Sequence, residues 1–187
     1  DSVKHEISKL DLPWRISSTI RLHQLSQDAP PVNSGVLMVY NTGSFTNPDA
    51  SNSIIDASDV KPYLRYLPTY PLHLDIAYPT YSWQLLFHHR SFVGLINNLD
   101  LTDEKLFTRL SDNIYKAKKD IPYKNMVIHE GDEIREETSA FNDVNNVRTM
   151  IEKRYANHQH SNILYHLDLK NLNKYSDYEI DILLSTY

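Results

Sequence analysis

The chain has 187 residues, of which 41% are hydrophobic and 23% are charged, a composition typical of a folded domain and too apolar for a disordered one. Twenty-four acidic against nineteen basic residues give a net charge of -5, which argues against a protein whose partner is a nucleic acid or an anionic membrane. The absence of cysteine excludes disulfides, cysteine-ligated zinc and thiol chemistry, and leaves the cellular compartment open. No apolar run approaches the roughly 20 residues that span a bilayer.

Two compositional biases bear on function. The chain contains thirteen tyrosines, whose flat amphipathic rings suit both core edges and sugar-binding clefts. It contains only four glycines, and neither the GxGxxG nor the GxxxxGK[ST] pattern occurs. The sequence therefore predicts no nucleotide bound through these motifs, and no cofactor.

Strands and helices alternate in the first half of the chain. Val3, Ile7 and Leu10 have helical spacing, and Pro13 follows them. A second helix is predicted over residues 59–66, where apolar residues recur every three or four positions. Three strands are predicted from β-branched or continuous apolar runs, over residues 16–22, 36–40 and 72–77.

The second half begins with a predicted hairpin over residues 83–96. Thr102 is predicted to cap a helix that carries an apolar stripe and ends near Lys119. Short strands are expected near residues 126–128 and at Ile134, and a helix over residues 143–155. A strand over residues 163–167 and a final helix that starts with the capping box of Ser176 and Glu179 complete the chain.

The order of these elements predicts an α/β fold with parallel strands. Four strand-helix units in 187 residues are about half of an eightfold barrel, which usually needs about 250 residues. We therefore expect a single domain over residues 1–187 that is the carboxy-terminal half of a (β/α)8 TIM-like barrel, with an α+β insertion at about residues 81–137. The alternative is a complete open doubly wound sheet.

Two motifs resemble family 18 glycoside hydrolases. GVLMVYNTG, residues 35–43, resembles the segment in which a Met-x-Tyr-Asp pattern ends the sixth strand of those barrels, and PLHLDIAYPTYSW, residues 71–83, resembles their seventh-strand segment. The runs SSTIRLHQL and YHLDLKNLNKYS resemble uncharacterised bacterial proteins of the glycoside-hydrolase-like barrel type. The resemblance implies a barrel with an insertion after its seventh strand, and a carbohydrate as substrate or ligand.

The chain departs from that family at its acidic residues. The DxxDxDxE signature of the fourth strand is absent, and Asn41 stands where the family has the sixth-strand acid. A catalytic acid of the family type would therefore belong to residues outside this sequence.

Two other acidic residues are candidates for catalysis. Asp75 and Asp168 are the acids placed toward the predicted carboxyl ends of strands, where barrel enzymes hold their sites, and glycoside hydrolysis uses two carboxyl groups. Each has a structural alternative. Asp75 could pair with Arg21 or His73 inside the fold, and Asp168 could turn the chain after its strand.

Other side chains at the strand ends are candidates for substrate binding. Tyr78, Tyr81 and Trp83 lie within six residues of one another, and their rings could line a cleft on which sugars stack. The remaining candidates share only their position near a strand end and are Arg21, His23, Tyr40, Asn41 and His166.

No metal site is predicted, although the chain contains nine histidines. The pairs His88-His89, His129-Glu130 and His158-Gln159-His160 lack the HExxH spacing, and we expect them in solvated loops. The acidic stretch 130–137 lacks the pattern of a calcium loop and is expected to form an exposed rim.

The sequence thus supports three hypotheses of different classes. The protein is a glycosidase-like hydrolase, or a catalytically silent barrel that binds a glycan or a protein. In the third hypothesis it is a structural half-barrel that closes by forming a homodimer. The expected partner is a carbohydrate, with a second copy or a missing amino-terminal half completing the barrel.

Overall fold

The computed structural model describes residues 5–6, 9–10, 16–166 and 168–186. It divides the chain into two compact units. Unit 1 comprises Asp1–Thr42, Ile55–Thr80 and Ala140–Tyr187, and unit 2 comprises Gly43–Ile54 and Tyr81–Ser139. Val3 and Ile7 of the predicted first helix lie outside the described residues.

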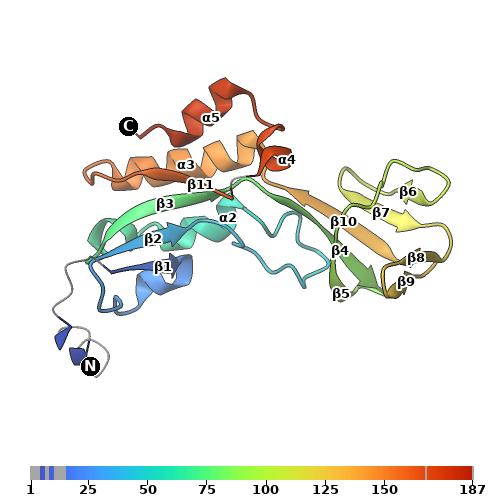
Figure 1. Ribbon diagram of the computed structural model, residues 1–187, viewed down its shortest axis with the longest axis horizontal. Coiled ribbons are helices and arrows are strands. Elements are labelled where there is room, and N and C mark those ends of the chain that lie inside the picture. The colour runs from blue at the N-terminus through green and yellow to red at the C-terminus, as the bar shows by residue number, and fades with distance from the viewer. Residues whose placement is uncertain (1–4, 7–8, 11–15, 167, 187) are drawn as a thin grey trace. The chain divides into compact units, whose positions relative to one another are not determined.

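Unit 1 is built on a four-stranded parallel sheet whose order is β1-β2-β3-β11. Its strands therefore lie side by side in the order in which the chain makes them, and their arrows point the same way in Figure 1. The strands are β1 Ser17–Arg21, β2 Ser34–Met38, β3 His73–Pro79 and β11 Asn162–Tyr165. These strands confirm the four predicted parallel strands, with ends shifted by one to two residues.

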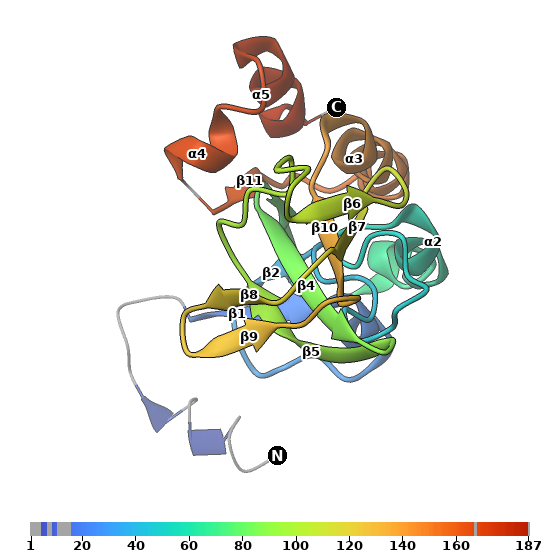
Figure 2. The same cartoon turned by 90° about the vertical axis from the view of Figure 1, so that its right-hand side faces the viewer.

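Helices of unit 1 form a row in which α3 contacts both α2 and α5 and packs on β3 (Figure 2). Parallel neighbours joined by right-handed crossovers place their connections on one face of the sheet, and the core lies between that face and the helices. At Gly35 on β2 an added Cβ would lie 2.8 Å from the side chain of Leu74 and 2.9 Å from that of Ile20, so any larger residue there would displace these two buried side chains. The helical elements are η1 Leu22–Ser26, α2 Ala57–Val60, η2 Lys61–Tyr63, η3 Leu67–Thr69, α3 Phe141–Tyr155, α4 Leu169–Leu172 and α5 Asp177–Leu184.

Unit 2 contains a five-stranded antiparallel sheet of order β5-β4-β10-β7-β6 and the separate hairpin β8-β9. Its core includes Leu86, Ile96 and Ile134. The β4-β5 hairpin turns at His89 and Arg90, both of which have positive φ, as a two-residue type I′ turn requires. The strands are β4 Ser82–His88, β5 Ser91–Ile96, β6 Phe107–Arg109, β7 Ile114–Ala117, β8 Ile121–Tyr123, β9 Met126–Ile128 and β10 Glu133–Thr138.

The prediction of a helix from Thr102 to Lys119 is wrong. Thr102 donates its N–H and its hydroxyl to Asp100, and the chain then forms the hairpin β6-β7. Leu110 of the expected apolar stripe is 51% exposed, whereas Phe107 is buried. Pairing of β7 with the central strand β10 outweighs the local helical pattern, as tertiary context often does.

Two other expectations need correction. The helix expected over residues 59–66 is shorter and begins earlier, because α2 ends at Val60 and the chain tightens into the 3-10 turn η2 around Pro62. The four parallel strands of unit 1 form an open sheet, so a closed barrel is not formed by the described residues. The α/β class in its general sense is confirmed, since the chain combines helices with parallel and antiparallel sheets.

Candidate functional site

The candidate site is the carboxyl edge of unit 1, which we define as the edge where β1, β2, β3 and β11 end. Their last residues are Arg21, Met38, Pro79 and Tyr165. Because the strands are parallel, all four ends meet at this edge, and ligands of α/β proteins bind at this end of the sheet.

Two tyrosines stack across this edge. Tyr40 and Tyr165 have ring centroids 4.9 Å apart and an interplanar angle of 9°. Met38 is in register with Ala77 and Tyr165 with Pro79, so Tyr40, two residues beyond Met38, is level with Pro79 on the same face of the sheet. The small proline between them lets the two larger rings meet above it. Tyr165 is 46% exposed, which leaves part of this aromatic surface open to a ligand.

Charged and polar groups surround the tyrosine pair. Burial and the neighbouring Tyr165 raise the pKa of the Tyr40 hydroxyl, and the positive charge of Arg21 partly opposes this. The ring of His166 lies 5.6 Å from that of Tyr165, edge to face. Asn41 is exposed and adopts the left-handed conformation, with a φ of 53°. The structure thus brings together four of the predicted binding residues.

Thr80 positions the last strand at this edge. It is fully buried, its N–H donates to the Tyr165 carbonyl at 2.7 Å, and its hydroxyl donates to the His166 carbonyl at 2.9 Å. The sequence predicts neither Thr80 nor Tyr165 as a site residue. Its apolar run predicts a strand that ends at residue 167, whereas β11 ends at Tyr165, and a strand end predicted there would have identified Tyr165.

Asp75 and Asp168 are not brought together. The Asp75 carboxylate accepts the N–H of Ser161, which precedes β11, and lies 3.6 Å from His73. Asp168 follows β11 and accepts the N–H groups of Lys170 and Asn171 as the N-cap of α4. The two carboxylates therefore lie toward opposite ends of the strand, and each has a structural task.

The other predicted binding residues have different surroundings. His23 is exposed in η1. Tyr78 is fully buried. Tyr81 and Trp83 belong to unit 2, where their rings lie 5.5 Å apart and the Trp83 indole N–H donates to Glu137 at 2.7 Å.

The acidic stretch 130–137 is only partly an exposed rim. Glu130 and Glu136 are exposed, but Asp132, Arg135 and Glu137 are at most 3% exposed. Arg135 and Glu137 belong to β10, which lies in the middle of its sheet. His88 lies with its Nδ1 2.6 Å from the buried Asp132 carboxylate.

One histidine also departs from the expectation of solvated loops. The side chain of His160 is 2% exposed and contacts Glu152 at 3.2 Å. Among the residues that the structure describes, His, Asp and Glu side chains do not gather in any group of three that could hold a metal ion.

Comparisons of the chain with protein families, with curated proteins and with solved structures find no match. Of the helices within the described ranges, none is both long and apolar enough to cross a membrane. The candidate site therefore rests on its own geometry.

Proposed function

We propose that the parallel sheet of unit 1 is half of a β/α barrel. The strand order β1-β2-β3-β11 supports this, because consecutive strands of a barrel are neighbours and an open doubly wound sheet reverses direction. The row of helices α2, α3 and α5 also supports it, since helices of a barrel cover only the outer face.

We further propose that the carboxyl edge binds carbohydrate. The observation that carries this is the stack of Tyr40 on Tyr165 beside Arg21 and His166, because exposed aromatic rings flanked by hydrogen-bonding groups suit the apolar faces and hydroxyls of sugars. Binding is favoured over hydrolysis by these residues. Hydrolysis needs two carboxyl groups within about 5 to 9.5 Å of each other, whereas Asp75 and Asp168 cap backbone groups at opposite ends of a strand.

The proposal is tested by affinity electrophoresis of the chain through gels that contain soluble polysaccharides of different linkage. We expect at least one polysaccharide to retard the protein. Tyr165→Ala should weaken this binding about tenfold, which corresponds to ~1.4 kcal/mol, because it removes the exposed ring. Tyr165→Phe should retain most of it.

Tyr178→Ala is the matched control, because Tyr178 is an exposed tyrosine of the same unit on α5 and is 74% exposed. An equal loss in the control, or no retardation by any polysaccharide, would contradict the proposal. The protein would instead be a glycosidase-like hydrolase if it releases reducing ends from a bound polysaccharide and if Asp75→Asn or Asp168→Asn abolishes this release.

A further inference from the structure

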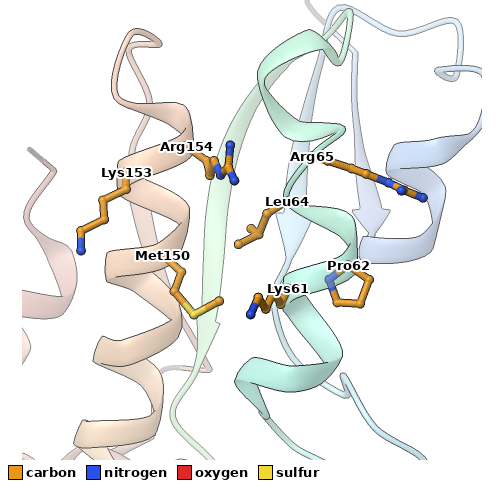
Figure 3. Close-up of a pocket in the computed structure, with 7 residues that line it drawn as sticks. All are labelled: Lys61, Pro62, Leu64, Arg65, Met150, Lys153 and Arg154. Atoms are coloured by element: carbon orange, nitrogen blue, oxygen red, sulfur yellow. The ribbon is translucent and has the colours of Figure 1, made fainter.

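A second site lies on the helical side of unit 1. A pocket of about 560 Å³ opens between η2 and α3. Lys61 and Leu64 line it from the side of η2, and Met150 and Arg154 line it from α3 (Figure 3). It is separate from the carboxyl edge, since none of the residues of the tyrosine pair contributes to it.

Positive charge is concentrated in this pocket. Four of its seven lining residues are cationic and none is acidic, although acidic residues outnumber basic ones in the whole chain. Lys61, Lys153 and Arg154 form no ion pair with any other residue in the part of the chain that the structure describes.

The position of α3 explains only part of this cluster. Lys153 and Arg154 occupy the last turn of α3, where the helix dipole favours cations. Lys61 and Arg65 come from a different segment, about 90 positions earlier in the chain. The charges of Lys61 and Arg154, one from each segment, repel each other, and an anion between them reduces that cost.

The side chains divide into an inner and an outer group. In Figure 3, Lys61 and Arg154 reach toward the space between the two segments, with Leu64 between them in that view, and Met150 points into the same space. Lys153 and Arg65 extend away on opposite sides. Leu64 is 6% exposed, so the inner cations lie beside an apolar floor.

We propose that this pocket binds a phosphate group that is attached to an apolar chain. The guanidinium of Arg154 suits two-point recognition of phosphate, and Lys61 supplies a second point charge. The apolar chain packs on Leu64 and on the adaptable side chain of Met150. A soluble phosphate ester and a phospholipid headgroup share this chemistry.

The test uses the methionine methyl groups as site-specific probes. The chain has three methionines, Met38 at the end of β2, Met126 in β9 and Met150 in α3, so the spectrum of the chain labelled with ¹³C at the methionine methyls has three signals. Met150→Leu assigns the signal of Met150. Octyl phosphate should shift that signal saturably and leave the other two in place.

The two halves of the ligand are separated by a second titration. Inorganic phosphate should bind at least about tenfold more weakly than octyl phosphate, because it lacks the apolar chain that the floor buries. Equal affinities of the two ions would overturn the apolar half of the proposal.

Charge recognition is tested with the double variant Lys61→Gln/Arg154→Gln, which should bind octyl phosphate at least about tenfold more weakly. The control Lys105→Gln/Lys119→Gln removes the same charge from exposed lysines of unit 2 and should bind as the unaltered chain does. An unshifted Met150 signal, equal shifts of all three signals, or an equal loss in both double variants would overturn the proposal.

The source of the phosphate is decided with phosphatidylcholine vesicles that contain phosphatidate. If these vesicles sediment the chain but not the Lys61→Gln/Arg154→Gln variant, the pocket recognises a lipid headgroup. If octyl phosphate binds and the vesicles do not, the ligand is a soluble phosphate ester.

Discussion

At the scale of single residues, two pairs of tyrosines in unit 1 lie in opposite environments. Tyr78 and Tyr155 are at most 2% exposed, whereas Tyr165 and Tyr178 are 46% and 74% exposed. The buried pair differs in its hydrogen bonds. The hydroxyl of Tyr155 accepts the N–H of Leu74 at 3.3 Å, but that of Tyr78 has no partner among the described residues. Removing these two buried hydroxyl groups should therefore have different effects on the free energy of unfolding.

Tyr78→Phe should leave the free energy of unfolding at pH 7 unchanged or raise it by up to about 1 kcal/mol, because it removes a buried hydroxyl that gains no hydrogen bond. Tyr155→Phe, the control, should lower it by about 1 kcal/mol. Urea denaturation measures both. A larger loss in Tyr78→Phe than in Tyr155→Phe would contradict this account.

The Tyr78 substitution also has a pH dependence. Burial raises the pKa of Tyr78 well above 10, and the negative charge of Glu152 adds to this while Arg148 opposes it. The folded state therefore holds this proton more tightly than the unfolded state. The stability that depends on the protonated Tyr78 hydroxyl is fully present below pH 10 and is lost as the pH rises through the folded-state pKa of Tyr78. Tyr78→Phe should lose less stability than the unaltered chain when the pH rises above 10.

At the scale of elements, β10 shows how a strand with charged side chains is buried in the interior of its unit. Glu137 accepts hydrogen bonds from Arg135 at 2.7 Å, from Trp83 at 2.7 Å and from the N–H of Ser53 at 2.9 Å. Arg135 also donates to the Asn47 carbonyl at 2.8 Å. This network attaches the 43–54 segment to the sheet of unit 2, because Asn47 and Ser53 both belong to that segment.

Glu137→Gln should lower the free energy of unfolding of unit 2 by about 3 kcal/mol or more, because it leaves the buried Arg135 charge without its partner. Glu136→Gln is the control, since it removes the same charge from an exposed neighbour on the same strand and should cost less than about 0.5 kcal/mol. Urea denaturation followed by tryptophan fluorescence compares them in chains that carry Trp14→Phe, so that Trp83 of unit 2 is the only tryptophan. Equal losses in the two variants would show that the network contributes little.

At the scale of the whole molecule, the parallel sheet is incomplete by the standards of its class. Within the described ranges β1 and β11 are each paired on one side only. Asn162 of β11 donates to Glu152 of α3, so the next residue, Ile163, lies on the sheet face opposite the helices, where it is 37% exposed. Parallel sheets are normally covered on both faces. The half-barrel proposal therefore implies that something covers this face and these edges.

The proposal predicts that the 187-residue chain self-associates, and sedimentation should detect a species of twice the 21.8 kDa of one chain. Ile163→Glu should shift the equilibrium toward the single chain, because it places a charge on the open face. Val93→Glu should not, since Val93 is a similarly exposed residue on β5 of unit 2. A single chain at every concentration would contradict closure of the barrel by a second copy.

Sequence patterns predicted the elements whose interactions are local. The capping box of Ser176 and Glu179 starts α5 as expected, and α3 ends at Tyr155 as its apolar stripe predicted. The continuous apolar runs identified β2 and β3 as parallel strands. Most residues of β3 are buried as that pattern predicts, whereas alternate residues of β2 are only partly buried. The predicted positions of the strand ends also identified four candidates for binding at one edge of the sheet, Arg21, Tyr40, Asn41 and His166.

Tertiary structure alone decided the rest, because the deciding contacts join residues far apart in the chain. The 102–119 segment has a helical pattern, yet it pairs with β10. Asp75 and Asp168 look equivalent in sequence, yet one accepts the N–H of Ser161 and the other caps α4. The stack of Tyr40 on Tyr165 depends on the register of three strands, and the cations of the pocket come from two segments about 90 residues apart. Periodicity describes only neighbours along the chain, so it cannot specify which of these distant groups meet.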